Sequence, residues 1–105
     1  LLIERDGSLV QFVPFNKKAW HAGVSSFKGR ENCNEFSIGI ELEGTDENAY
    51  TDDQYRALID ITKELMLVFK DIKKENIVGH SDIAPGRKTD PGKAFDWHYY
   101  LSNLV

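Results

Sequence analysis

The sequence is poor in several features that would place it outside the ordinary globular proteins. It has one cysteine, three prolines and one methionine in 105 residues. No disulfide can form within the chain, which excludes a small secreted domain held together by disulfides. The longest nearly apolar stretch, Leu65 to Phe69, is far shorter than the roughly 20 residues of a membrane-spanning helix. Internal repeats and low-complexity tracts are also absent.

Positively charged residues are also fewer than negatively charged ones. The chain has 13 Lys and Arg against 17 Asp and Glu, for a net charge of −4. This balance argues against a protein that binds nucleic acid through its phosphates, because such proteins present positive faces. The apolar fraction of 41% and the charged fraction of 29% are typical of a folded domain and not of a disordered chain. The length suits one domain, which we expect to span residues 1–105.

The first half of the chain is predicted to be mainly β-structure. Asp6-Gly7 is a strong hairpin signal and lies between two β-prone segments, Leu1–Arg5 and Ser8–Phe15. Strict alternation of apolar and polar or small residues predicts a strand at Phe36–Glu43. The glycine-spaced segment Asn16–Asn34 is predicted to be a long irregular loop, a kind of segment that often carries function.

The second half is predicted to be mainly helical. Thr51-Asp52-Asp53-Gln54 has the capping-box pattern, and apolar residues then recur at helical spacing as far as Ile72. A short buried strand at Ile77-Val78, a turn-rich loop at Ser81–Lys93 and a last helix running from an Asp96 cap to Leu104 should follow. The predicted fold class is therefore α/β: a central mixed β-sheet with helices packed on it.

Residues typical of a zinc site lie in the last third of the chain. His80 follows the strand predicted at 77–78, and Asp90 lies across a loop rich in glycine and proline. Imidazole nitrogens and carboxylate oxygens are both zinc ligands, and ligands at strand ends and in loops can converge on one ion. Lys88 would supply a positive charge near Asp90. Taken alone, this spacing is a weak signal, because a histidine and an aspartate ten residues apart are more often a solvated surface pair than a metal site.

Glu41 is a candidate proton carrier. It lies on the polar face of the strand predicted at Phe36–Glu43. Beside a metal, a carboxylate can take a proton from water and pass it to a leaving amine. The alternative is that Glu41 and Glu43 simply face solvent on the outer side of the sheet.

Other residues support weaker hypotheses. Trp20 and His21 lie in the long loop and suit the wall of a sugar or peptide site, although Trp20 is equally suited to anchoring that loop to the core. Cys33 paired with His21 or His80 would make a nucleophile and base. No helix N-terminus is evident beside Cys33 to activate it, which favours a buried inert thiol. His98 is predicted to be a surface or packing residue.

Two long runs in the sequence resemble the AmpD-type N-acetylmuramoyl-L-alanine amidases: Phe36–Asp46 and Gly79–Gly92. Shorter runs carry the same resemblance: Ala19–Val24, Cys33-Asn34, Tyr50–Asp52 and Ala94–Trp97. The resemblance covers essentially the whole chain. It implies a central mixed sheet flanked by helices, in a fold shared with phage lysozyme-like amidases and peptidoglycan recognition proteins.

The resemblance assigns roles to the candidate residues. By similarity, His80 and Asp90 are two ligands of a Zn²⁺ cofactor. Glu41 resembles the general base that activates water, and Lys88 resembles the cation that stabilises the negative charge of the tetrahedral species. The bond implied is the amide between N-acetylmuramic acid and L-alanine in muropeptides.

The resemblance is strongest to the cytoplasmic branch that acts on 1,6-anhydro-muropeptides in peptidoglycan recycling. It therefore implies a muropeptide substrate, a cytoplasmic location, and neither nucleic acid nor membrane as a partner. Trp20 and Arg87 fall in regions that line the substrate groove of the family. Asn32 stands where related cytoplasmic members carry an arginine. This difference affects how the carboxylates of the substrate would be bound.

The resemblance also implies that the chain is the larger, C-terminal part of one amidase domain, incomplete at its N-terminus. The third zinc ligand of the family is a histidine on an early strand, ahead of the position that matches Leu1. Neither His21 nor His98 matches it, so we expect two of three ligands here.

Two alternatives to a zinc amidase follow from the same residues. A muropeptide-binding domain without catalysis is one, although such relatives typically lose a metal ligand. Glu41, His80, Lys88 and Asp90 are all present here, which favours the enzyme. A cysteine peptidase that uses Cys33 on the same substrate is the other alternative.

Overall fold

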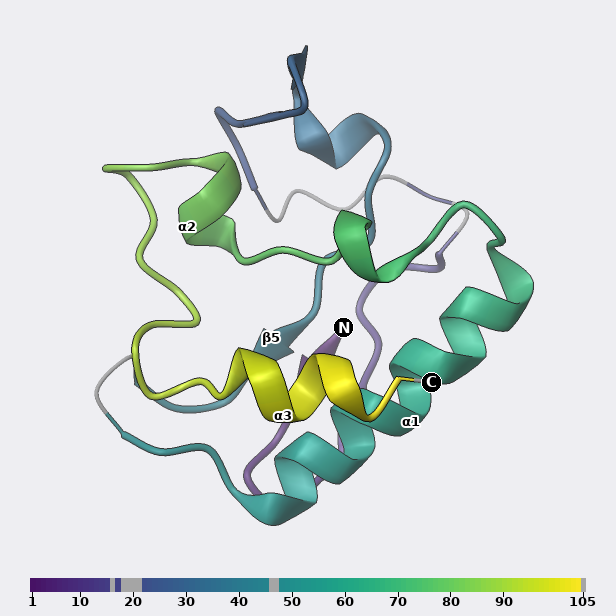
Figure 1. Cartoon of the computed structure of the whole chain (residues 1–105), viewed down its shortest axis with the longest axis vertical. Helices are drawn as coiled ribbons and strands as arrows, with labels where there is room; N and C mark the ends of the chain where they lie inside the picture. Colours follow the sequence, from purple (N-terminus) through teal and green to yellow (C-terminus); the bar gives the residue numbers. More distant parts are fainter. Residues whose placement is uncertain (16, 18–21, 46–47, 105) are drawn as a thin grey trace.

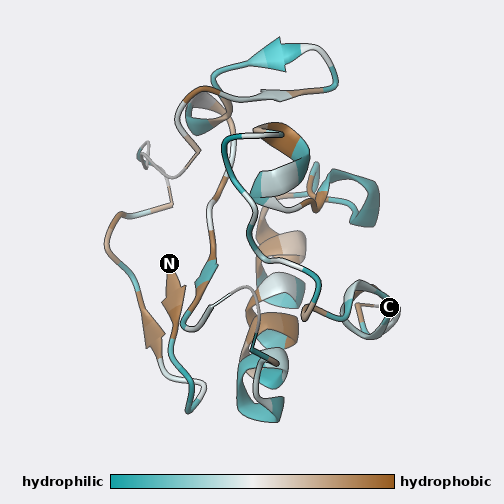
Figure 2. Ribbon diagram, turned by 90° about the vertical axis from the view of Figure 1, so that its left-hand side faces the viewer, coloured by the Kyte–Doolittle hydropathy of each residue, from teal (hydrophilic) through white to brown (hydrophobic). Residues whose placement is uncertain are grey.

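The computed structural model describes residues 1–15, 17, 22–45 and 48–104 (Figure 1). Its elements, in chain order, are β1 (Leu2–Ile3), β2 (Leu9–Val10), β3 (Ser26–Phe27), β4 (Arg30–Glu31), the 3₁₀ helix η1 (Cys33–Glu35), β5 (Glu41–Leu42), α1 (Asp52–Val68), the 3₁₀ helix η2 (Lys74–Asn76), α2 (His80–Ile83) and α3 (Trp97–Ser102). Strands β2, β1 and β5 form a mixed three-stranded sheet in that order. The sheet lies on one side of α1 and α3 on the other (Figure 2). The predicted α/β class, a mixed sheet with helices packed on it, is confirmed.

The N-terminal hairpin is confirmed, although its second strand is shorter than predicted. β1 pairs antiparallel with β2, with Leu2 opposite Val10 and Ile3 opposite Leu9. Gly7 makes the turn with a φ of 89°, a conformation that glycine adopts without steric cost. β2 ends at Val10 and not at Phe15, because β1 offers only two residues for it to pair with.

The central strand is also shorter than its alternation predicted. Only Glu41–Leu42 form a ladder, parallel to β1, with Leu2 opposite Glu41 and Ile3 opposite Leu42. A segment forms a strand only where a neighbouring segment pairs with it. In this register, residues 36–38 have no residue of β1 opposite them. The prediction of a strand over Phe36–Glu43 is therefore wrong in extent.

The prediction of an irregular loop at 16–34 is wrong for its described second half. β3 and β4 form an antiparallel hairpin, with Ser26 opposite Glu31 and Phe27 opposite Arg30. The turn between the two strands has φ values of 50° at Lys28 and 82° at Gly29. Two left-handed central residues are typical of a tight hairpin turn, but Lys-Gly is a weaker sequence signal for this turn than Asn-Gly.

Helix α1 follows its prediction closely. Thr51 Oγ1 accepts a hydrogen bond from the Gln54 amide at 3.1 Å, and Gln54 Oε1 accepts one from the Thr51 amide at 3.0 Å, which makes the capping box. The helix ends at Val68, about one turn before Ile72. The predicted cap of α3 is also confirmed, since Asp96 accepts a hydrogen bond from the Tyr99 amide.

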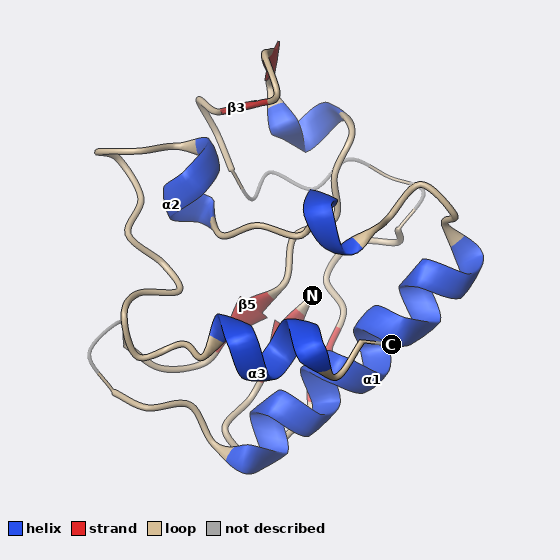
Figure 3. Ribbon diagram, viewed as in Figure 1, coloured by secondary structure: helices blue, strands red, loops and turns tan. Residues whose placement is uncertain are grey.

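The segment before His80 differs from its prediction. Residues 74–76 form η2, and Ile77-Val78 belong to no strand of the described part of the chain (Figure 3). Val78 is 38% exposed, so the predicted buried strand is wrong. An apolar pair by itself does not specify a strand, because pairing depends on a neighbour elsewhere in the fold.

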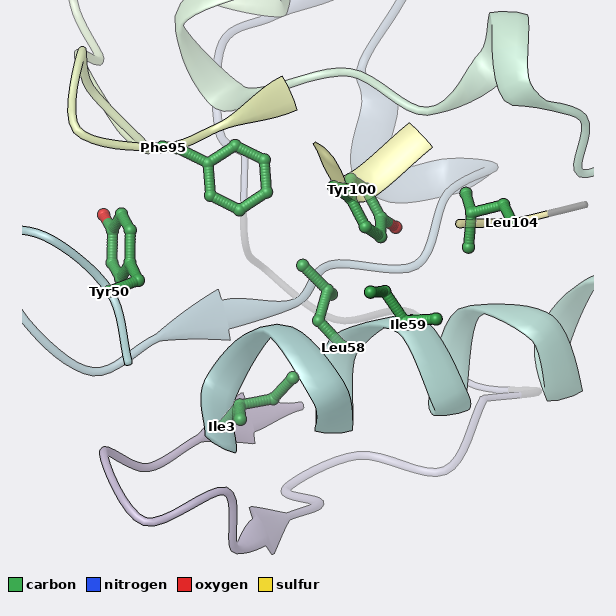
Figure 4. Close-up of a cluster of buried hydrophobic side chains, with 7 residues drawn as sticks. All are labelled: Ile3, Tyr50, Leu58, Ile59, Phe95, Tyr100 and Leu104. Carbon is green, nitrogen blue, oxygen red and sulfur yellow. The ribbon is translucent and has the colours of Figure 1, made fainter. Parts of the chain in front are cut away.

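The main core lies where α1 meets the sheet and α3 (Figure 4). Its buried members are Ile3, Tyr50, Leu58, Ile59, Phe95, Tyr100 and Leu104. Ile3 lies on the sheet side of α1, and the aromatic rings and Leu104 lie on the α3 side (Figure 4). The described helices include none with both the length and the apolar character needed to cross a membrane.

Gln54 joins the sheet to the N-terminus of α1. Its side chain is fully buried, and its Nε2 donates to the carbonyl oxygens of Ile3 at 3.3 Å and Glu43 at 2.8 Å. Its Oε1 accepts from the amide of Thr51 and the guanidinium of Arg5. One side chain therefore fixes β1, β5 and α1 relative to one another.

We expect Gln54→Ala to lower the free energy of unfolding by about 2–4 kcal/mol, because it leaves the carbonyls of Ile3 and Glu43 without this donor. Gln11, which is exposed, provides the matched control, and Gln11→Ala should change stability by less than about 0.5 kcal/mol. Urea unfolding monitored by circular dichroism measures both. Equal effects of the two substitutions would contradict the role of Gln54.

Tyr100 makes stability depend on pH in the alkaline range. Burial raises the pKa of its phenol above the ordinary 10.0, while the hydrogen bond with Thr62 acts in the opposite direction. The unfolded chain then loses this proton at a lower pH than the folded chain. The stabilisation is fully present below the unfolded pKa and is lost as the pH rises through the folded pKa.

Tyr100→Phe should therefore reduce the loss of stability between about pH 9 and pH 11. Tyr99→Phe, at a residue that is 47% exposed, is the control for removing a phenol hydroxyl from the same helix. Denaturant unfolding at a series of pH values tests this. A slope in Tyr100→Phe equal to that of the unaltered protein would refute the assignment.

Candidate metal centre

Three side chains from three different segments converge at the end of the sheet. Glu41 comes from β5, His80 is the first residue of α2, and Asp90 lies on the loop that follows α2. One potential ligand atom from each lies within 4.8 Å of the others. The structure thus brings together the three residues that the sequence proposed as metal ligands and proton carrier.

His80 is the centre of this cluster. Its Nδ1 lies 2.6 Å from Asp90 Oδ2 and 3.7 Å from Glu41 Oε1. The His80 side chain is 8% exposed, compared with 39% for Asp90 and 52% for Glu41. The imidazole is therefore held inside the protein, while both carboxylates reach solvent and could meet a ligand there.

A tight helical turn sets the direction of His80. The Gly79 amide donates to Asp82 Oδ2 at 2.9 Å, and the Asp82 amide donates to the Gly79 carbonyl at 3.0 Å. The Ala84 amide then bonds to the His80 carbonyl at 2.9 Å. His80 was predicted to follow a strand directly. It begins α2 instead, because these local bonds close a turn at Gly79.

Close packing brings the Asp90 loop against α2. The Ser81 amide donates to the Asp90 carbonyl at 3.1 Å. A Cβ atom placed on Gly79 would lie 2.7 Å from Pro91 Cδ and 3.3 Å from the Asp90 carbonyl oxygen. The first of these separations is shorter than a van der Waals contact, so only glycine allows the two segments to approach this closely. No local sequence signal marks Gly79 or Ser81 for this role, because the role depends on the proximity of two backbone segments.

Arg87 and Lys88 lie on the same loop but have different surroundings. The Arg87 guanidinium donates to the backbone carbonyls of Ala22 and Val24, so it holds the 22–24 segment against this loop. Lys88 is half-buried, and its amide donates to the Ala84 carbonyl at 3.0 Å. The proposed roles of Arg87 in substrate binding and of Lys88 in catalysis stay predictions.

The remaining candidates lie elsewhere. Trp20 and His21 lie outside the described residues. Cys33 is 1% exposed and packs with Ala22 and Ile83, an environment typical of an inert structural thiol. His98 is exposed on α3, as expected for a surface residue.

The donor set fits zinc. One imidazole nitrogen and two carboxylate oxygens are ligands that zinc accepts, whereas magnesium and calcium prefer oxygen alone. The cluster also borders a groove of about 1110 Å³, with Phe36, Ile38 and Ile40 among its apolar lining residues. The chemistry of the side chains and their access to this groove are those of a metal site that can receive a ligand.

Comparison with known proteins defines the class. The profile of the N-acetylmuramoyl-L-alanine amidase family matches residues 1–93, and the chain belongs to this family. It is 66% identical over 96 residues to the 1,6-anhydro-N-acetylmuramyl-L-alanine amidase AmpD of Escherichia coli, covering 91% of this chain and 52% of that protein. AmpD of Enterobacter cloacae is 65% identical over 104 residues, with 99% and 55% covered. The chain thus spans about half the length of the relatives it matches.

Solved structures agree with this assignment. A crystal structure of a selenomethionine derivative of AmpD superimposes with a TM-score of 0.95 at 58% identity, covering 99% of this chain and 57% of that one. The amidase AmiD of Escherichia coli, solved with the substrate anhydro-N-acetylmuramic acid-L-Ala-D-γ-Glu-L-Lys, gives a TM-score of 0.85 at 38% identity, with 91% and 40% covered. The fold described above is the amidase fold.

We expect Gly79→Ala to lower the free energy of unfolding by about 1–3 kcal/mol, because its Cβ would overlap Pro91. It should also shift the NMR resonances of the His80 ring. Gly29→Ala is the control, since Gly29 has a φ of 82° but a Cβ added there would have no atom within 4 Å. That substitution should cost stability through backbone strain and leave the His80 ring resonances unchanged. Unshifted His80 resonances in Gly79→Ala would contradict the steric argument.

Proposed function

We propose that the protein hydrolyses the amide bond between N-acetylmuramic acid, in its 1,6-anhydro form, and L-alanine in muropeptides released during peptidoglycan recycling. The observation that carries this proposal is the convergence of Glu41, His80 and Asp90 in a chain of the amidase family. The similarity to enzymes named 1,6-anhydro-N-acetylmuramyl-L-alanine amidases supports the choice of substrate. The solved complex of AmiD with an anhydro-muramyl peptide supports it as well.

We assign the metal site to zinc, with His80 and Asp90 as ligands. When bound, zinc acts as a Lewis acid that polarises the scissile carbonyl and lowers the pKa of water. His80 Nδ1 and Asp90 Oδ2 lie 2.6 Å apart, which is a direct hydrogen bond. Two ligands of one tetrahedral zinc ion lie about 3.3 Å apart, so a small outward shift of the half-buried Asp90 carboxylate would let both groups hold the ion. A catalytic zinc site commonly has three protein ligands. The family resemblance places the third, a histidine, ahead of Leu1, and that stays a prediction.

Glu41 is assigned the proton transfer. It lies farther from His80 than Asp90 does and is 52% exposed, which suits a base that must reach a water molecule and the substrate. Its carboxylate takes a proton from the attacking water as the new C–O bond forms at the carbonyl carbon. The same proton then passes to the L-alanine nitrogen as the C–N bond breaks. The products are the free lactyl carboxylate and the free amino group of the peptide.

Two residues of the loop that follows α2, together with Trp20, carry the other proposed roles. The Lys88 ammonium is assigned to stabilise the negative charge that develops on the carbonyl oxygen. Arg87 and Trp20 are assigned to the walls of the substrate groove. A cytoplasmic location, and residues 1–105 as the larger, C-terminal part of a single amidase domain, also stay predictions.

Glu41→Gln in the complete protein tests whether Glu41 acts as the general base or is itself a zinc ligand. We expect hydrolysis of an anhydro-muropeptide to fall by at least about a hundredfold, with zinc still bound at one equivalent. Product formation measured by chromatography and zinc measured by elemental analysis give the two readouts. Unchanged turnover would refute the role of Glu41 as general base. Loss of zinc would show that Glu41 is a zinc ligand.

His80→Ala should behave differently, because it removes the donor at the centre of the cluster. Both zinc and turnover should be lost together, and added zinc should not restore activity. His98→Ala is the matched control, since His98 is exposed on α3 and should retain both. Stoichiometric zinc in His80→Ala would exclude His80 from the ligand set.

A further inference from the structure

The Asp90 carboxylate is carried by a loop, so its position depends on what holds the neighbouring backbone. The Asp90 carbonyl accepts a hydrogen bond from the Ser81 amide at 3.1 Å. The next carbonyl along the chain, that of Pro91, accepts one from the Tyr50 hydroxyl at 2.8 Å. The first bond ties the loop to α2, which carries His80. The second ties it to a side chain 41 residues earlier in the sequence.

Tyr50 is itself held firmly. It is 9% exposed, and its ring packs edge-on against Phe95, with the centroids 5.8 Å apart and the planes at 74°. Figure 4 shows this ring at the edge of the core beside Phe95. Tyr50 directly precedes Thr51, the cap of α1. The hydroxyl is therefore presented from a segment with little freedom to move.

The same segment is connected to the strand that carries Glu41. Gln54, in the first turn of α1, donates to the Glu43 carbonyl at 2.8 Å, and its capping box with Thr51 fixes the backbone next to Tyr50. Glu43 is two residues beyond Glu41. Hydrogen bonds and short stretches of backbone thus link the end of β5, through the start of α1 and Tyr50, to the Asp90 loop.

We propose that Tyr50 is a positioning residue of the metal centre: by holding the Pro91 carbonyl, it keeps the Asp90 carboxylate on His80 and at a fixed distance from Glu41. This inference rests on the proposed function, since it assigns a purpose to the geometry of that site. Through its bond to the Pro91 carbonyl, Tyr50 acts on the cluster by way of Asp90. Removing a group that is bonded directly to a metal ligand commonly changes metal affinity by about 10–100-fold. Tyr50 acts one residue farther out, so its effect should fall at the lower end of this range.

The test compares Tyr50→Phe with Tyr100→Phe in the complete protein. Both substitutions delete one buried hydroxyl from the same aromatic core, since Tyr100 is 3% exposed and bonds to Thr62 at 2.7 Å. The dissociation constant for Zn²⁺ is measured by competition with a chromophoric chelator. We expect affinity to weaken about tenfold in Tyr50→Phe and to stay within about twofold in Tyr100→Phe. The His80 ring resonances of the metal-free protein should shift in the first variant alone.

The outcomes separate positioning from general stability. Thermal unfolding of each variant shows how much stability the lost hydroxyl contributed. Equal zinc affinity in Tyr50→Phe and the unaltered protein would overturn the inference and leave the proposed function intact. Equal weakening in both variants would make the effect one of stability, which also overturns it. Absence of zinc binding by the unaltered protein would overturn the proposed metal centre together with the inference.

A second variant keeps the test decisive if Tyr50→Phe does not fold. Gly79→Ala presses on the Pro91 ring, because its Cβ would lie 2.7 Å from Pro91 Cδ, while Tyr50 remains. Because Gly79 also precedes His80, weakened zinc binding in the folded Gly79→Ala protein would support control of affinity by the position of Pro91 only together with a shift of the Asp90 carboxylate resonance. Unchanged affinity there would overturn it.

Discussion

The buried amide of Gln54 is the interaction on which most of the described fold depends. A fully buried amide group is costly unless its donors and acceptor are satisfied. Here they bond to the backbone of β1, to the end of β5 and to the cap of α1. Since β1 and β5 pair over only two residues each, the ladder alone is too short to fix the sheet on the helix. The side chain of Gln54 supplies the missing constraint.

The geometry of the metal centre depends on this arrangement of sheet and helix. Glu41 is placed by the parallel register of β5 on β1, and His80 by the turn that opens α2. Asp90 is placed by two consecutive backbone carbonyls, one bonded to Ser81 and one to Tyr50. Each of the three side chains comes from a different segment. The chemistry of the site therefore depends on bonds between main-chain groups and buried side chains outside it.

Local signals in the sequence were sufficient for the helices and the turn. The capping box at Thr51, the apolar period of α1 and the Asp96 cap of α3 each involve residues within a few positions of one another, so they can be recognised without the fold. The same holds for the Asp6-Gly7 turn. Strand lengths could not be predicted, because β2 and β5 end where β1 ends. The hairpin around Gly29 was missed because Lys28 takes the left-handed conformation that Asn usually adopts.

The sequence by itself determined the fold class, the long helix and its cap, and the identity of the three side chains that make the candidate metal centre. The family-specific sequence runs that contain these residues also identified the class of enzyme. Only the tertiary structure decided that Glu41, His80 and Asp90 meet, that His80 begins a helix, and that Gly79 and Tyr50 hold the Asp90 loop in place. The physical reason is that these are contacts between groups distant in the chain. Such contacts depend on steric fit and hydrogen-bond partners that no local pattern records.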